Sequence, residues 1–160
     1  MSEQQQAIFT IEKIYLKDVS LEIPNAPQVF AEQEPPGIDI KLHNEVRAIQ
    51  EGLYEVVLTA TVTAKHNEKT AFLVEVAQAG IFQVRNFPQQ DLEAVINVIC
   101  PKNLLPYARE AVSSILGRAG FPMVMLPHVG FEGIYQQRLQ DAQQPSRQPQ
   151  PGAAAVLKGL

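Results

Sequence analysis

Hydrophobic and polar residues alternate near the start of the chain, which predicts a long half-buried β-strand from Phe9 to Ile23. Apolar side chains fall mostly on odd positions of this segment and polar ones on even positions. Ile14 and Leu16 break the alternation, so we expect either a β-bulge or a stretch covered on both faces. Residues 24–37 then contain four prolines, and a connection of that length suggests a crossover rather than a hairpin.

Three more strands are predicted by the same alternation. The second begins at Ile38, and residues 45–53 are expected to return the chain. The third strand has threonines on one face, and the turn at 66–68 leads to a fourth. The apolar faces of the third and fourth strands consist of Tyr54, Val56, Leu58, Ala60, Val62, Ala64, Phe72, Val74 and Val76. We therefore expect a four-stranded antiparallel sheet whose first connection is a long crossover.

Helical spacing replaces the alternation after Pro88, a residue suited to the first turn of a helix. The apolar positions of this helix are Leu92, Val95, Ile96 and Ile99. We expect Cys100 and Pro101 to interrupt it and Asn103 to cap a second helix that ends at Gly117. The buried stripe of that second helix is predicted to be Leu105, Ala108, Val112, Ile115 and Leu116.

The end of the chain combines a short helix with a tail. The last helix is indicated by Phe131, Ile134, Tyr135, Arg138 and Leu139. From residue 141 the composition changes to Gln, Pro and Ala, which predicts a disordered tail over 141–160. The fold class is therefore expected to be α+β, with residues 1–140 as one domain.

An apolar loop, residues 120–130 (GFPMVMLPHVG), separates the last two predicted helices. Its two prolines and flanking glycines disfavour a helix or a central strand, although its composition is that of a core. Two interpretations stay open: the loop covers its own core, or it lines a surface that takes up apolar partners. The methionines favour the second slightly, because their unbranched side chains adapt to varied shapes. Taken alone, the loop favours the first, because such coverings are common.

Charge and composition narrow the classes of partner. The 160-residue chain is 46% hydrophobic and 19% charged, with a formal net charge of -4. Residues 1–80 hold 12 acidic and 6 basic side chains, which argues against binding nucleic acid and suits a basic protein partner. The segment MSEQQQAIF has no signal-peptide pattern, and no apolar run is long enough to span a membrane. We therefore expect a cytoplasmic protein without direct membrane insertion.

Candidate catalytic chemistry is sparse. Cys100 is the only cysteine, and His43, His66 and His128 lie far apart along the chain. No phosphate-binding loop, nucleophile elbow or metal-ligand spacing is present. We therefore expect no enzyme activity, no cofactor and no metal site, unless the fold brings the histidines together. An oligomeric scaffold, or a protein that binds small molecules beneath the apolar loop, is one hypothesis for such a chain, and it stays open as the alternative to the function that the resemblance below implies.

Several separated segments resemble the SecB family of protein-export chaperones: IYLKDVSLEIPNAP (14–27), YEVVLTATVTA (54–64), TAFLVEVAQAGIF (70–82), CPKNLLPYARE (100–110) and SSILGRAGFP (113–122). The similarity covers about residues 7–140. It implies a cytoplasmic homotetramer, a dimer of dimers, that holds precursor proteins unfolded without using ATP. It also implies delivery of these precursors to the SecA motor ATPase for export across the inner membrane.

The resemblance assigns roles to single positions. Family positions that contact SecA match Asp18, Glu22, Leu73 and Glu75, and those that influence tetramer assembly match Val74, Val76 and Gln78. The implied client groove lies between the crossover, the interhelix loop and the nearby sheet, with Phe30, Phe121, Met123, Met125 and Leu126 as candidates. The zinc of this handover belongs to the SecA C-terminal tail, so no metal is assigned to this chain. With the resemblance, the apolar loop is interpreted as one wall of that groove.

Overall fold

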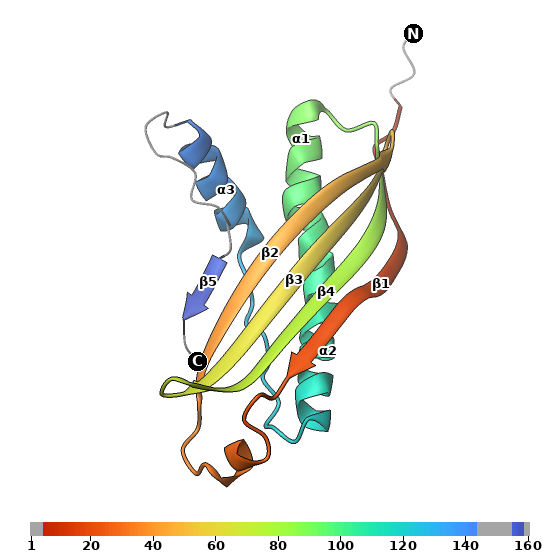
Figure 1. The fold of residues 1–160 in the computed structure, drawn as a ribbon. Coiled ribbons are helices and arrows are strands. Elements are labelled where there is room, and N and C mark those ends of the chain that lie inside the picture. Colours follow the sequence, from red (N-terminus) through yellow and green to blue (C-terminus); the bar gives the residue numbers. More distant parts are fainter. Residues whose placement is uncertain (1–4, 144–154, 159–160) are drawn as a thin grey trace.

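A long antiparallel sheet forms one layer of the structure, a computed structural model that describes residues 5–143 and 155–158 (Figure 1). Its strands are β1 (Ile8–Glu22), β2 (Gly37–Gln50), β3 (Leu53–His66), β4 (Lys69–Arg85) and β5 (Ala155–Lys158). Their order in the sheet is β1-β4-β3-β2-β5. The predicted four strands are confirmed. The structure adds β5, which pairs with β2 and lies within the segment that the sequence assigns to the tail.

The connection between β1 and β2 is the predicted crossover. Because β1 lies at one edge of the sheet and β2 on the far side of β3, the chain must pass beneath the end of the sheet (Figure 1). This connection includes a 3-10 helix, Gln28–Ala31, whose Val29 is buried in the core. The crossover therefore brings Phe30, next to Val29, to the end of the molecule where the interhelix loop also begins.

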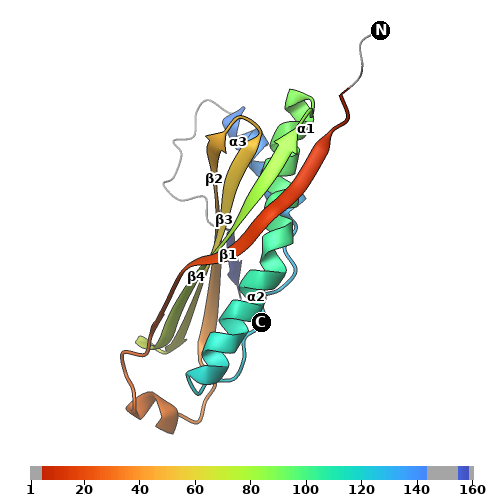
Figure 2. The same cartoon turned by 90° about the vertical axis from the view of Figure 1, so that its right-hand side faces the viewer.

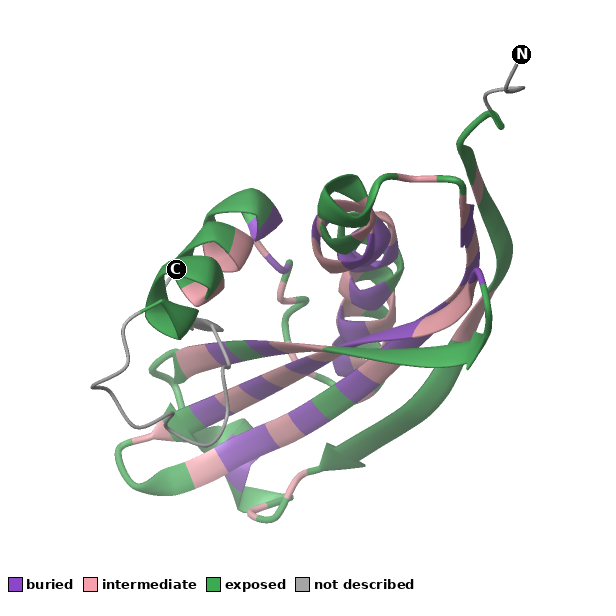
Figure 3. Cartoon of the chain, turned by 90° about the horizontal axis from the view of Figure 1, so that it is seen from above, coloured by how far each residue is buried: buried purple, intermediate pink, exposed green. Residues whose placement is uncertain are grey.

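Two register shifts in β1, between Ile11 and Lys13 and between Leu16 and Asp18, confirm the predicted irregularity. Each shift changes the phase of the strand, so that Ile14 and Leu16 lie on the same face as Ile11. The strand is nevertheless exposed along most of its length rather than half-buried as predicted (Figure 3). Its edge position is the reason, because the helix layer covers the centre of the sheet.

The second strand is longer than predicted. β2 continues to Gln50, and only Glu51 and Gly52 form the turn to β3. The prediction that residues 45–53 return the chain is therefore wrong. Pairing with β3 extends the ladder through a segment of weak alternation, with one irregularity between Ala48 and Gln50. Gly52 has a φ of 74°, a left-handed conformation that a two-residue turn requires and that glycine adopts without strain.

The second layer is one continuous helical rod, α1 (Gln89–Ala94), a π-helical turn (Val95–Ile99) and α2 (Cys100–Arg118), as Figure 2 shows. The predicted interruption at Cys100 and Pro101 is therefore wrong. Proline lacks the N–H that an α-helix needs, and the wider π turn just before Pro101 accommodates this defect. Asn103 is not a cap: its Nδ2 donates to the Ile99 carbonyl at 2.7 Å.

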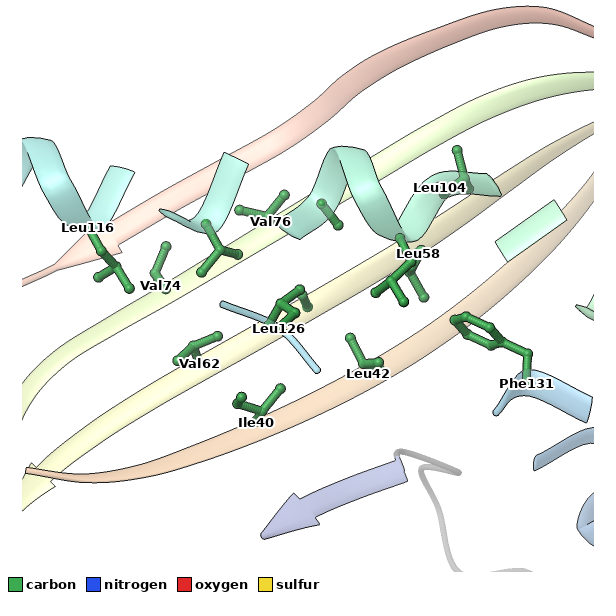
Figure 4. Packing of buried hydrophobic residues seen from close by; sticks show 14 of the residues in the cluster. Ile40, Leu42, Leu58, Val62, Val74, Val76, Leu104, Leu116, Leu126 and Phe131 are labelled. Atoms are coloured by element: carbon green, nitrogen blue, oxygen red, sulfur yellow. The ribbon is translucent and has the colours of Figure 1, made fainter. Parts of the chain in front are cut away.

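The core lies between α2 and the inner faces of β3 and β4 (Figure 4). Fully buried members from the strands include Val56, Leu58, Val62, Val74, Val76 and Phe82, and those from α2 include Leu104, Ala108, Val112 and Leu116. A final helix, α3 (Phe131–Ala142), is anchored through the buried ring of Phe131. The α+β class is confirmed, and only one face of the sheet carries helices (Figure 2).

Close contact between α2 and the sheet depends on Gly80 in β4. A β-carbon added there would lie 2.7 Å from Cε2 of Phe82 and 3.1 Å from Cδ2 of Leu104. Both of these side chains are fully buried, so neither has room to move away.

We predict that Gly80→Ala lowers the free energy of unfolding by about 1–3 kcal/mol, because overpacking a filled core forces strain on its neighbours. Urea unfolding measures the change. Gly133→Ala is the matched control, since nothing lies within 4 Å of the added methyl group and Gly133 is inside α3. That control should gain roughly 0.5–1 kcal/mol from helix propensity. Equal stability of Gly80→Ala and the wild type would contradict this description of the core.

Candidate functional site

The helix-free face of the sheet brings together the predicted acidic residues. Strand register places Glu22 opposite Leu73, and it places Ser20 opposite Glu75, with Asp18 two residues further along β1. Residues paired across antiparallel strands, and those two apart on one strand, share a face. Asp18, Glu22 and Glu75 are exposed and Leu73 is half-buried. These four residues, which we call the acidic face, therefore form one surface that points away from α2.

Hydrogen bonding fixes part of the acidic face. The Oγ1 of Thr61, directly opposite Glu75 on β3, donates to Oε2 of Glu75 at 3.1 Å. Within residues 5–143, no cation forms an ion pair with Asp18, Glu22 or Glu75. Their negative charge is therefore available to a basic partner.

A second polar cluster lies beside the acidic face on the same side of the sheet, and the sequence analysis missed it. Lys17 Nζ donates to Oε1 of Glu55 at 2.7 Å, and the Tyr15 hydroxyl donates to Oε2 of the same carboxylate. These two hydrogen bonds lower the pKa of Glu55. Desolvation, followed by the bond to Glu55, raises the pKa of Tyr15 to about 12. Because Lys17 neutralises Glu55, this cluster ends the acidic face rather than extending it.

No sequence signal pointed to this cluster because β1 and β3 are not neighbours in the sheet. β4 lies between them, and its Ala79 is paired with Tyr15 on one side and Val57 on the other. A small residue at that point leaves room for the Tyr15 side chain to reach across β4 to Glu55 on β3. Strand order, which alternation does not reveal, creates the contact.

An aromatic cluster forms where the crossover meets the interhelix loop. The rings of Phe30 and Phe121 have centroids 5.1 Å apart, and those of Phe121 and Phe72 are 4.8 Å apart. Phe72 is buried, Phe121 is half-buried and Phe30 is 50% exposed, so the cluster leads from the core to the surface. Gly120, with a φ of 90°, permits this approach, since a β-carbon there would lie 3.3 Å from the Phe30 ring. Two of the predicted groove residues are thus in contact.

The apolar loop has both buried and exposed residues, so it covers the core at one position and presents apolar side chains at others. Met123 and Met125 are 72% and 66% exposed, whereas Leu126 is 1% exposed and lies over the sheet near Val62 (Figure 4). The prediction that Leu126 lines the groove is therefore not supported, because a side chain inside the core presents no open surface. Leu126 instead anchors the loop. The methionines remain candidates for client contact.

Two side chains of α2, which the sequence analysis did not select, hold the loop in place. Ser113 Oγ donates to the Val124 carbonyl at 2.8 Å, and Arg109 Nε donates to the Leu126 carbonyl at 2.7 Å. These bonds satisfy carbonyls that an irregular backbone leaves without strand or helix partners. They also fix the direction of the loop, so that Met125, between the two bonded carbonyls, faces outward.

The predicted assembly positions lie inside this chain. Val74 and Val76 are fully buried, and Gln78 is 5% exposed, with its Nε2 donating to the Tyr15 carbonyl at 3.1 Å. None of the three presents a free surface, so their assembly role stays a prediction.

A different surface is open on the inner face of β1, beyond the edge of the helix layer. Its exposed apolar residues are Ile11, Leu16, Val19 and Leu21.

The histidines do not meet. His43 lies on β2 with its Nε2 3.0 Å from Oε1 of Glu45, His66 ends β3, and His128 is in the interhelix loop. In the part of the chain that the structure describes, no three His, Cys, Asp or Glu side chains are close enough to hold a metal ion. Desolvation raises the pKa of the buried Cys100 thiol to about 12, which makes it unreactive. None of the described helices has the length and apolarity needed to span a membrane.

A family model described as preprotein translocase subunit SecB matches residues 2–142. The chain belongs to the SecB family. It is 59% identical over 146 residues to protein-export protein SecB of Chromobacterium violaceum, covering 89% of this chain and 97% of that one. It is 50% identical over 139 residues to the SecB protein of Neisseria gonorrhoeae, covering 86% and 95%. The resemblance seen in the sequence is confirmed.

A solved structure shares the fold of this SecB-family chain. It is a SecB-like chaperone of Mycobacterium tuberculosis in complex with a peptide from an antitoxin. The match has a TM-score of 0.63 at 19% identity and covers 76% of this chain and 91% of that one. At this identity the likeness concerns the fold alone.

Proposed function

We propose that this chain is an ATP-independent holdase that binds unfolded precursor proteins in the cytoplasm and delivers them to SecA for export across the inner membrane. The observation that carries the proposal is the separation of two unlike surfaces in a SecB-family chain. One is apolar and exposed at the loop and crossover, with Phe30, Met123 and Met125, and the other is the acidic face. The first suits an unfolded chain and the second a basic partner.

Binding at the apolar surface needs no catalysis. A protein that binds unfolded chains and not folded ones shifts the folding equilibrium by mass action and competes with folding. Burying apolar area contributes about 25 cal/mol per Å² with little regard to sequence, and methionine side chains adapt to partners of varied shape. Exposed Met123 and Met125, on a loop that α2 holds in place, suit this use.

Handover is supported by the geometry of the sheet. The loop packs on the side of α2, whereas Asp18, Glu22 and Glu75 point away from that helix. A client on the loop therefore leaves the acidic face open, and both partners bind at once. SecA, with its zinc-bearing C-terminal tail, is the partner that the family resemblance names, and a basic segment of that tail fits the uncompensated carboxylates.

Assembly as a homotetramer, a dimer of dimers, is supported by the apolar row on β1. Four large aliphatic side chains stay exposed along this edge strand, together with its unpaired backbone groups. An edge of this kind is a template for pairing with another chain. A second copy of this chain carries the same apolar row, so two copies can cover each other's edge in a symmetric interface. Several client surfaces on one oligomer would then bind one long precursor with added avidity.

We predict that Met123→Asp with Met125→Asp weakens binding of an unfolded precursor at least about tenfold, because two apolar contacts of roughly 1.5–3 kcal/mol each are lost. The delay that excess protein imposes on refolding of a slow-folding precursor measures this affinity. Met123→Leu with Met125→Leu, which keeps the surface apolar, should bind nearly as the wild type does. No delay of refolding by the wild type would refute the holdase function itself.

Reversal of charge on the acidic face should weaken SecA binding without changing precursor binding. Asp18→Lys with Glu75→Lys is predicted to weaken SecA binding about tenfold at low salt, since attraction becomes repulsion, and to leave precursor binding unchanged. The difference in SecA affinity between this variant and the wild type should become smaller at higher salt, because salt screens the charges. Glu51→Lys, which reverses one charge in the β2–β3 turn, is the control. Unchanged SecA affinity at low salt would count against this face as the docking surface.

The open edge of β1 predicts the outcome of disrupting it. Leu16→Asp with Val19→Asp should convert the native tetramer to smaller species, because both side chains lie in the exposed apolar row. Native mass spectrometry reports the change directly. Lys13→Asp is the matched control, since Lys13 lies on the same strand but on the opposite face. A wild-type monomer, or a tetramer that survives the double substitution, would rule out β1 as the assembly edge.

A further inference from the structure

The outer edge of β2 is occupied in part by the chain itself. β5 pairs with it in antiparallel register, with Ala155 opposite Leu42 and Lys158 opposite Asp39. Residues 43–50 of β2 have no described strand on this edge, and Val46 and Ile49 are exposed there. Among the described residues, this edge therefore has a short paired part and a longer unpaired part in one continuous strand (Figure 1).

The chemistry of such an edge defines what it accepts. Unpaired N–H and C=O groups of an edge strand bind any extended backbone, and apolar neighbours favour apolar side chains. The segment that occupies the edge, Ala155–Lys158, reads AVLK, and its two central residues have this character. Val156 and Leu157 are the first large aliphatic residues after Leu139. β5 thus has the composition of a short extended client segment.

The paired part is short enough to be exchanged. The four residues of β5 form few backbone hydrogen bonds with β2. Each bond adds little net stability, because the same backbone groups form hydrogen bonds with water when β5 leaves the edge. Ordering those residues costs conformational entropy of comparable size. A longer extended chain gains the same bonds at Asp39 to Leu42 and continues along residues 43–50, where β5 does not reach.

We infer that β5 is an internal competitor for client chains, which holds the β2 edge until an extended apolar segment adds a strand in its place. The inference rests on the proposed holdase function. Because β5 is tethered, it faces the edge at a high effective concentration. Short or weakly apolar segments then fail to displace it, and long unfolded ones succeed. The consequence is a threshold that discriminates unfolded precursors from brief exposed stretches of folded proteins.

Removing the competitor tests the inference. The full chain is compared with a chain ending at Gln143 and with Val156→Pro, since proline breaks a paired strand. Gly152→Pro, outside β5, is the matched control. The probe is a fluorescent peptide of ten alternating valine and threonine residues, followed by anisotropy. We expect truncation and Val156→Pro to raise its affinity at least about threefold and the control to leave it unchanged.

Hydrogen exchange at residues 39–42 provides the second measurement. Exchange there should accelerate in the truncated chain, and a synthetic peptide of residues 152–160 should restore protection and compete with the probe. Equal or lower probe affinity after truncation would overturn the inference while leaving the holdase function intact. Protection that depends on protein concentration would assign the strand to a second copy and overturn the intramolecular form. If neither chain binds the probe or delays precursor refolding, the proposed function fails and the inference falls with it.

Discussion

One-sided packing of a single helical rod on the sheet is the constraint from which the other features of this molecule follow. α2 places Leu104, Val112 and Leu116 against the inner faces of β3 and β4, and the close approach at Gly80 leaves no space between the layers. The inner apolar positions of those two central strands are covered by that contact. The opposite face is then free to be polar, and β1 and β2 extend past the width of the rod (Figure 3).

The apolar loop depends on the same rod. Once Leu126 enters the core and Ser113 and Arg109 bind the loop carbonyls, an extended backbone must direct alternate side chains outward. Met123 and Met125 are therefore exposed because of the anchoring around them, not in spite of it. A core-like composition and an open apolar surface thus coexist in one segment, which resolves the conflict that the sequence presented.

Alternation was sufficient for β3 and β4, where the inner positions meet the rod, and it was insufficient wherever a contact came from a distant element. The π turn before Pro101 lets the helix continue through a proline, although sequence rules predict a helix break there. Pairing with β3 carries β2 through residues that lack a strand pattern. The contact of Tyr15 with Glu55 needs the strand order β1-β4-β3. The acidic face was predictable in part, because spacing along β1 aligns Asp18 with Glu22, but its junction with Glu75 on β4 required the register.

The outer two of the four long strands, β1 and β2, both have an edge that can pair with another strand, but the two edges differ in what covers them. β1 presents apolar side chains along an open edge, an arrangement that suits permanent burial against an equal surface. β2 carries a short strand from the same chain, and its residues 43–50 pair with no other described strand on that edge, an arrangement that suits exchange. A permanent subunit interface needs a large and specific surface. Exchange of one strand for another needs weak pairing that segments of many sequences can replace. A holdase requires both properties at once, and a sheet covered on one face only supplies an edge for each.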